Sequence, residues 1–225
     1  MRISTAEVST FADTRAPRDP YRRFMTSHIA ATSATAARIA ALTTAVLVVT
    51  ALPAVAEQAS HHDATGDVVL LGVVDDSKTA QPEWRPGDIK RIGVAHGTHR
   101  VRVRLNFRDV AQGTDGAYFY KIRTPQRRFE LAGFTAQERP QGEWFLLNPS
   151  RQRSVSCAGL RHRIDYTNEQ INVSVPRRCI GHPARVRVGA HARTTIDAKE
   201  QTRLDDAYST GQVERITLGP WLRRC

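Results

Sequence analysis

The alternation of apolar and polar side chains across residues 160–190 constrains the fold more than any other feature of this 225-residue chain. Successive side chains of a β-strand point to opposite faces, so apolar residues at alternate positions indicate one buried face and one solvated face. Three runs have this pattern and predict three antiparallel strands: Leu160, Ile164 and Tyr166; Ile171, Val173 and Val175; Val186, Val188 and Ala190.

The connections between these three runs differ in kind. Thr167-Asn168 has the composition of a tight turn and predicts a hairpin between the first two runs. Residues 176–183, with a proline at each end, are too long and too proline-rich for such a turn. We therefore expect this second connection to cross from one sheet to another.

The remainder of the exported region also consists of short strand-like runs, the clearest being residues 101–107. Residues 57–66 are expected to be a flexible tail, residues 194–211 a polar segment without a strand, and residues 213–218 the last strand. Some ten short strands without a helical pattern predict an all-β domain over residues 67–225. The expected architecture is an antiparallel two-sheet β-sandwich, jelly-roll-like, preceded by a signal peptide. The further expected strands are residues 67–74, 89–94, 118–123, 129–131, 143–147 and 153–157.

Residues 1–56 are interpreted as an N-terminal extension and signal peptide. Residues 39–56 form an uncharged apolar core that follows Arg38 and ends in the small-x-small sequence Ala54-Val55-Ala56, which predicts cleavage after Ala56. The alternative is an uncleaved membrane anchor through residues 39–56. A start at Met25 would give a leader of ordinary length. The sequence thus predicts a secreted, extracellular protein.

The chain is basic, with a formal net charge of +11 that comes mostly from arginine. Arg100, Arg102 and Arg104 alternate with apolar residues, as do Arg185 and Arg187. Together they could form a basic outer surface, although a solvated face is the simpler interpretation. Nucleic-acid binding is not expected, because neither a groove helix nor exposed aromatics interleave with these arginines.

Three cysteines lie in the exported region, and two of them are predicted to pair. Cys157 and Cys179 are separated by two strand-like runs, so a hairpin would bring the chain back near its starting point. In an oxidising compartment these two cysteines are expected to form a disulfide. Cys225 is left over, either free or linking a dimer.

Motifs of known enzyme classes are absent from the sequence: there is no phosphate-binding loop, nucleophile elbow or His-Glu-x-x-His. A Ser-His-Asp set built from Ser154 or Ser156 with His162 and Asp165 is disfavoured, because His162 and Asp165 would point to opposite faces of one strand. The expectation is therefore a protein without enzymatic activity, and no catalytic residue is assigned.

Metal binding has two weak candidates in the sequence. His61-His62-Asp63 falls in the expected tail, where adjacent residues do not easily converge on one ion. Scattered acids could instead supply oxygen ligands to a structural calcium, although their spacing is not compact and turns explain several of them more simply. These acids are Asp63, Asp67, Asp88, Asp205 and Asp206. No metal ligand and no cofactor is predicted.

Two tryptophans are the candidate ligand contacts. Trp84 lies in a proline-rich loop and Trp144 in a short strand, and an exposed indole can stack on a sugar ring. Packing in the core or as a loop anchor is the more common role for such residues. Tyr118 and Tyr120 share a strand face with Ile122 and are expected in the core.

Five segments of the exported region resemble a group of small secreted actinobacterial proteins without assigned function. They are residues 87–89 (GDI), 101–109 (VRVRLNFRD), 157–166 (CAGLRHRIDY), 173–181 (VSVPRRCIG) and 185–189 (RVRVG). More distantly, the Gly-Asp-Ile strand and the following hairpin are similar to carbohydrate-binding and DOMON-like sandwich domains. This resemblance implies a secreted sandwich, but no haem-ligand pattern or sugar-binding aromatic pair of those domains is matched here.

The function expected from the sequence is an exported, non-enzymatic binding module for a glycan or an acidic cell-envelope polymer. The alternative is a secreted protein-interaction protein, such as an inhibitor or adhesin, and an enzyme of unrecognised type is the least favoured. An exposed apolar patch would favour the interaction protein.

Overall fold

The structure is a computed structural model that describes residues 56–72, 77–110, 112, 115–151, 153–195, 202–210 and 215–225. The predicted N-terminal extension and apolar core lie outside these residues, except for Ala56 at the predicted cleavage position. Among the described residues, no helix has the length and apolar character needed to cross a membrane.

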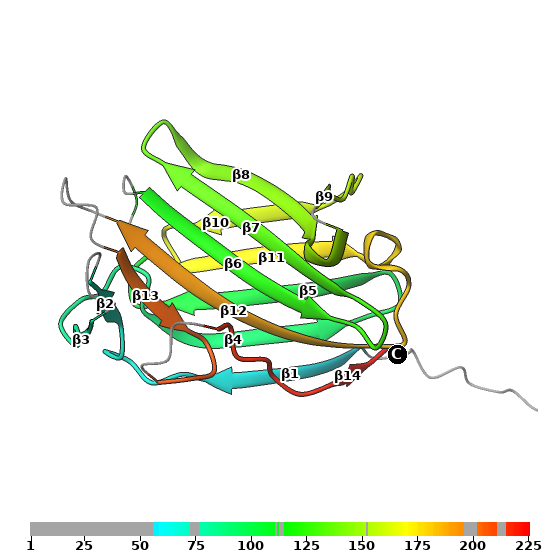
Figure 1. Cartoon of the computed structure of the whole chain (residues 1–225), viewed down its shortest axis with the longest axis horizontal. Coiled ribbons are helices and arrows are strands. Elements are labelled where there is room, and N and C mark those ends of the chain that lie inside the picture. The colour runs from blue at the N-terminus through cyan, green and yellow to red at the C-terminus, as the bar shows by residue number, and fades with distance from the viewer. Residues whose placement is uncertain are drawn as a thin grey trace, which may run out of the picture. The chain divides into compact units, whose positions relative to one another are not determined.

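The described chain forms two antiparallel sheets packed against each other (Figure 1). The smaller sheet has the order β1 (Glu57–His62), β4 (Ile89–His96), β5 (Arg100–Phe107), β11 (Gln170–Pro176), β10 (Arg161–Asp165). The larger sheet has the order β3 (Lys78–Ala80), β2 (Val69–Leu71), β13 (Thr202–Asp206), β12 (Arg185–Thr195), β6 (Asp115–Arg123), β7 (Arg128–Ala136), β8 (Arg139–Asn148), β9 (Arg153–Ser154). A further short strand of this sheet, β14 (Leu222–Arg223), lies outside this order and pairs with β12. The predicted all-β, two-sheet sandwich is confirmed.

The core lies between the sheets and follows the predicted alternation. On β5, the residues Val101, Val103, Leu105 and Phe107 are buried, while the arginines between them are at least partly exposed. The tyrosines of β6 face the same core, as predicted from their position beside Ile122. Burying each such side chain contributes about 1.5–3 kcal/mol, so the pattern fixes which face of each strand is turned inward.

The predicted crossover is also confirmed. β11 belongs to the smaller sheet and β12 to the larger, and the short 3-10 helix η2 (Arg177–Ile180) lies between them. The Arg177 guanidinium holds this corner by donating hydrogen bonds to the carbonyls of Thr98 and Pro183, each at 2.6 Å. The predicted disulfide joins Cys157 to Cys179 of η2, and Cys225 is a free thiol.

The expected flexible tail at residues 57–66 is wrong over most of its length. Residues 57–62 form strand β1, which pairs with β4 from Glu57 opposite His96 to His62 opposite Arg91. The sequence EQASHH lacks an apolar alternation, so backbone pairing to a partner distant in sequence makes this strand. The sandwich therefore begins at β1 rather than at residue 67.

The C-terminal expectations also need correction. The segment expected to lack strands contains the end of β12 and all of β13, whose acidic residues are buried rather than solvated. Within the expected strand at 213–218, residues 215–218 are not a strand and residues 213 and 214 lie outside the described residues; the last strand is β14. In the expected strand at 67–74, only Val69–Leu71 is regular, and residues 73 and 74 are not described.

Candidate functional site

A groove runs across the outer face of the smaller sheet and receives side chains from all five strands. Its volume is about 1020 Å³. The walls carry five arginines: Arg91, Arg102, Arg104, Arg161 and Arg163. Amide and hydroxyl side chains supply further hydrogen-bonding groups, from Gln58, Ser60, Asn106, Gln170, Asn172 and Ser174.

The two-residue period of the strands explains how the groove is built. Residues whose neighbours enter the core must point outward, which places Arg102 and Arg104 of β5 on this face. On β4, the corresponding outward positions opposite these arginines are Ala95 and Gly93. A Cβ atom added at Gly93 would meet nothing within 4 Å, so small residues leave open space between the arginine-bearing strands.

Neutral groups hold the arginines in place. The Arg104 Nε donates to Asn172 Oδ1 at 2.9 Å, and the Arg91 Nε donates to Ser60 Oγ at 2.6 Å. Beside the groove, the Arg100 Nε donates to Ser174 Oγ at 2.5 Å. These contacts orient the guanidinium groups without neutralising them.

The groove is electropositive because five arginines line it, and none of its described lining residues is an aspartate or a glutamate. Arg163 is 3.6 Å from Asp165, whereas the other four groove arginines form no ion pair with any described residue. Just beyond the groove, burial lowers the pKa of Arg100, and the charges of Arg161, Arg102 and Arg178 lower it further. Such a cluster of cations favours an anionic ligand.

The basic outer surface that the sequence offered as the alternative to a solvated face is assembled only in part. Arg102 and Arg104 line the groove, but Arg185 and Arg187 lie on β12 of the other sheet and pack on the Trp221 ring, at 4.8 Å and 5.8 Å from its centroid. Sequence reasoning missed the groove arginines Arg91, Arg161 and Arg163. The alternation in residues 160–166 could have predicted that Arg161 and Arg163 lie on the outer face of the sheet. It could not have predicted that their strand belongs to the same sheet face as β5.

Trp144, a predicted ligand contact, does not line the groove and makes internal contacts instead. Its ring lies against Gly133, where an added Cβ would come within 2.6 Å of it, and stacks on His162 with centroids 5.0 Å apart. Its Nε1 donates to the Gln141 carbonyl at 2.9 Å. It does border a smaller cavity of about 290 Å³ at the edge of the sandwich.

Trp84, the other predicted contact, is also outside the groove. It lies in the loop before β4 and is half-buried, with the Arg203 guanidinium 3.8 Å from its ring centroid. This cation–π contact anchors the loop to β13. The two tryptophans therefore have separate packing roles and do not form one shared aromatic platform.

The disfavoured Ser-His-Asp set is not assembled. His162 turns toward Trp144, while Asp165 accepts hydrogen bonds from Asn168, which lower the pKa of this carboxyl. In the His61-His62-Asp63 group, a weak metal candidate in the sequence, His61 stacks on Tyr208 with ring centroids 4.8 Å apart.

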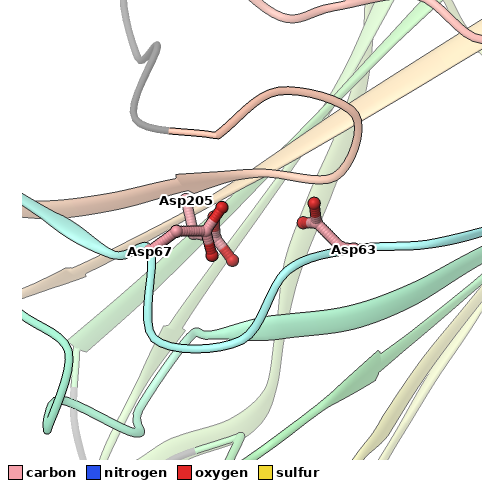
Figure 2. Close-up of side chains that lie close together, drawn as sticks. All are labelled: Asp63, Asp67 and Asp205. Atoms are coloured by element: carbon pink, nitrogen blue, oxygen red, sulfur yellow. The ribbon is translucent and has the colours of Figure 1, made fainter.

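Of the five scattered aspartates considered as calcium ligands from the sequence, three converge in the structure. Asp63, Asp67 and Asp205 each place one carboxylate oxygen within 4.8 Å of the others (Figure 2). Asp88 instead binds Arg108, with Oδ2 2.9 Å from the guanidinium, and Asp206 accepts from the backbone N–H of Thr217 and Tyr208. The spacing in sequence gave no indication of this convergence.

The larger sheet presents an aromatic patch, defined here as Phe119, Phe134 and Phe145. Phe134 and Phe145 are 46% and 44% exposed. Phe134 contacts both other rings, at centroid distances of 5.7 Å to Phe119 and 6.5 Å to Phe145.

Comparison with known proteins gives no match to a protein-family model, to a curated protein or to a solved structure.

Proposed function

We propose that this domain binds an acidic cell-envelope polymer along the groove of the smaller sheet. The observation that carries the proposal is a groove of about 1020 Å³ that is lined by five arginines and, among the residues that the structure describes, by no acidic side chain. A planar guanidinium presents paired N–H donors that match the two oxygens of a carboxylate or phosphate. The groove also crosses five strands, or about 19 Å at the usual spacing between strands, which suits an extended ligand.

The lining favours an acidic glycan or wall polymer over a nucleic acid. Proteins that bind single strands stack bases on exposed aromatic rings. The only aromatic ring among the groove's described lining residues is His162, whose ring already stacks on Trp144. Serine, asparagine and glutamine side chains beside the arginines can instead bind polymer hydroxyl groups.

The proposal is binding without catalysis and outside the cell. Hydrolysis of a glycan generally uses a pair of carboxyl groups, and the part of the groove lining that the structure describes supplies none. Export is supported by the predicted signal peptide and by the disulfide between Cys157 and Cys179, a bond that persists in oxidising compartments.

Polymer titrations of the purified full-length chain test this proposal. Teichoic acid and heparin serve as anionic ligands, and chitin and cellulose oligosaccharides as neutral ones, each at low and high salt. We expect saturable binding of an anionic polymer that weakens as salt rises. Replacing Arg102 and Arg104 together by Gln should weaken this binding at least tenfold.

A matched control uses Arg128→Gln, an exposed arginine of β7 outside the groove. It should leave binding within twofold of the wild type. Equal losses for the groove and control variants would contradict a specific groove, and so would binding of neutral polymers alone.

The aromatic patch supports a second candidate function, contact with a protein partner. Exposed phenylalanines in mutual contact are the kind of surface that this alternative predicts. The variant Phe134→Ser distinguishes the two functions: polymer binding should be unaffected by it if the groove is the site.

A further inference from the structure

Three aspartates from separate segments meet at one end of the sandwich. Asp63 directly follows β1 of the smaller sheet, Asp67 precedes β2, and Asp205 lies on β13 of the larger sheet. Figure 2 shows the carboxylates of Asp67 and Asp205 side by side, with Asp63 across from them. One oxygen from each lies within 4.8 Å of the others.

Backbone hydrogen bonds hold two of these carboxylates and the turn between Asp63 and Asp67. Ile89 N–H donates to Asp205 Oδ2 at 2.6 Å, and Ala64 N–H donates to Asp63 Oδ1 at 3.1 Å. Gly66 turns the chain with a φ of +80° and donates its N–H to Asp88 Oδ2 at 2.8 Å. The arrangement is therefore built by the fold rather than by free surface side chains.

The second observation is that buried oxygens in this cluster lack a partner. Asp205 is 2% exposed, and its Oδ1 accepts no hydrogen bond. The same holds for Asp63 Oδ2 and for both carboxylate oxygens of Asp67. The ion pairs found among the described residues do not involve these three aspartates: they join Arg108 to Asp88, Arg139 to Glu143, and Arg163 to Asp165. A buried carboxylate without a compensating charge or donor is costly.

The electrostatics agree with this geometry. Burial, and then the nearby carboxylates, raise the pKa of Asp63 to about 7 and the pKa of Asp205 to about 9. Burial also raises the pKa of Asp67. A bound cation would supply the positive charge that these groups lack.

We propose that Asp63, Asp67 and Asp205 bind a calcium ion. Oxygen-only ligands select a hard cation. Ca–O bonds of about 2.3–2.6 Å place ligand oxygens up to about 5 Å apart, whereas Mg–O bonds of about 2.0–2.1 Å limit them to about 4 Å. Oxygens that lie within 4.8 Å of one another fall inside the span that calcium allows.

The ion would join the segment after β1 to β13, and so would link strands of the two sheets. Calcium binding does not depend on the proposed groove function, and either can fail without the other.

Calorimetric titration of the chelator-treated full-length chain with CaCl₂ tests the site. We expect saturable binding of one ion per chain and a rise in Tm with CaCl₂ relative to chelator. Asp67→Asn and Asp205→Asn should each weaken binding at least tenfold and remove the rise in Tm. The Asp205→Asn variant should still fold, because its side-chain amide keeps an oxygen acceptor for the Ile89 N–H; Asp67→Asn provides an independent test.

The matched control is Asp115→Asn, which removes an exposed carboxylate at the start of β6. It should bind calcium as the wild type does. The proposal would be overturned by the absence of saturable CaCl₂ binding, by equal affinities in the control and both cluster variants, or by tighter binding of MgCl₂.

Discussion

The side-chain amide of Gln141 pairs with the backbone of Ile164 as a neighbouring strand would. Its Nε2 donates to the Ile164 carbonyl at 2.9 Å, and its Oε1 accepts from the Ile164 N–H at 3.0 Å. Ile164 lies on β10, the last strand of the smaller sheet, whose free edge would otherwise leave these groups unpaired. Gln141 belongs to β8 of the other sheet, so the pair also ties the two sheets together.

Gln141→Ala should therefore lower the free energy of unfolding by about 1–2 kcal/mol, because two hydrogen bonds are lost. Urea unfolding followed by circular dichroism measures this change. Gln126→Ala, at an exposed turn position, is the matched control and should have little effect. Equal stability of both variants would show that the edge contact is energetically neutral.

Removal of the disulfide should destabilise the domain more strongly. Cys157 and Cys179 enclose a loop with a sequence separation of 22, and closing a loop of this size contributes about 3 kcal/mol in the chain-entropy interpretation. Cys157→Ala should lower the Tm under oxidising conditions, as measured by calorimetry. Cys225→Ala should leave the Tm unchanged, and a wild-type Tm for Cys157→Ala would contradict a stabilising role for the bond.

Gly133 should resist even a small side chain. An alanine Cβ at this position would come within 2.6 Å of the Trp144 ring, which is held between Gly133 and His162. Gly133→Ala should cost about 1–3 kcal/mol through overpacking and should shift the tryptophan fluorescence. Gly93→Ala is the control, since its Cβ would meet nothing within 4 Å. If both alanine variants were equally stable, Trp144 would have to be free to move.

His191 should make the domain sensitive to acid. Burial, followed by the charges of Arg193 and Lys121, lowers the pKa of His191 to about 4, while the unfolded chain has a value near 6.5. Between these values the unfolded state binds more protons, so stability is complete above pH 6.5 and falls as the pH drops toward 4. The contribution is at most about 3 kcal/mol.

Urea unfolding at pH 4.5 and pH 7.5 measures this effect. His191→Gln should lose less stability on acidification than the wild type, whereas the exposed His62→Gln should behave as the wild type does. The buried aspartates act in the opposite direction, so the informative quantity is the difference between each variant and the wild type. An unchanged difference in His191→Gln would exclude His191 as the acid-sensitive group.

Local patterns in the sequence were sufficient for much of the fold. The alternation in residues 101–107 and 160–190 correctly identified β5, β10, β11 and β12, and their buried faces. The proline-rich segment between β11 and β12 correctly indicated a change of sheet, and the cysteine spacing correctly indicated a disulfide. These features depend on neighbours along the chain. An alternation with a period of two residues directly indicates which side chains are buried.

The sequence alone determined that this chain forms a disulfide-linked β-sandwich, but only the tertiary structure decided what its surfaces bring together. β1 exists because β4 offers backbone partners, and the groove arises because β10, β11, β5 and β4 lie side by side. The acidic cluster joins Asp63 and Asp67 to Asp205, far away in the sequence. The physical reason is that strand periodicity fixes the face of each side chain, whereas the order and register of strands are set by long-range backbone pairing and by the packing of the whole core.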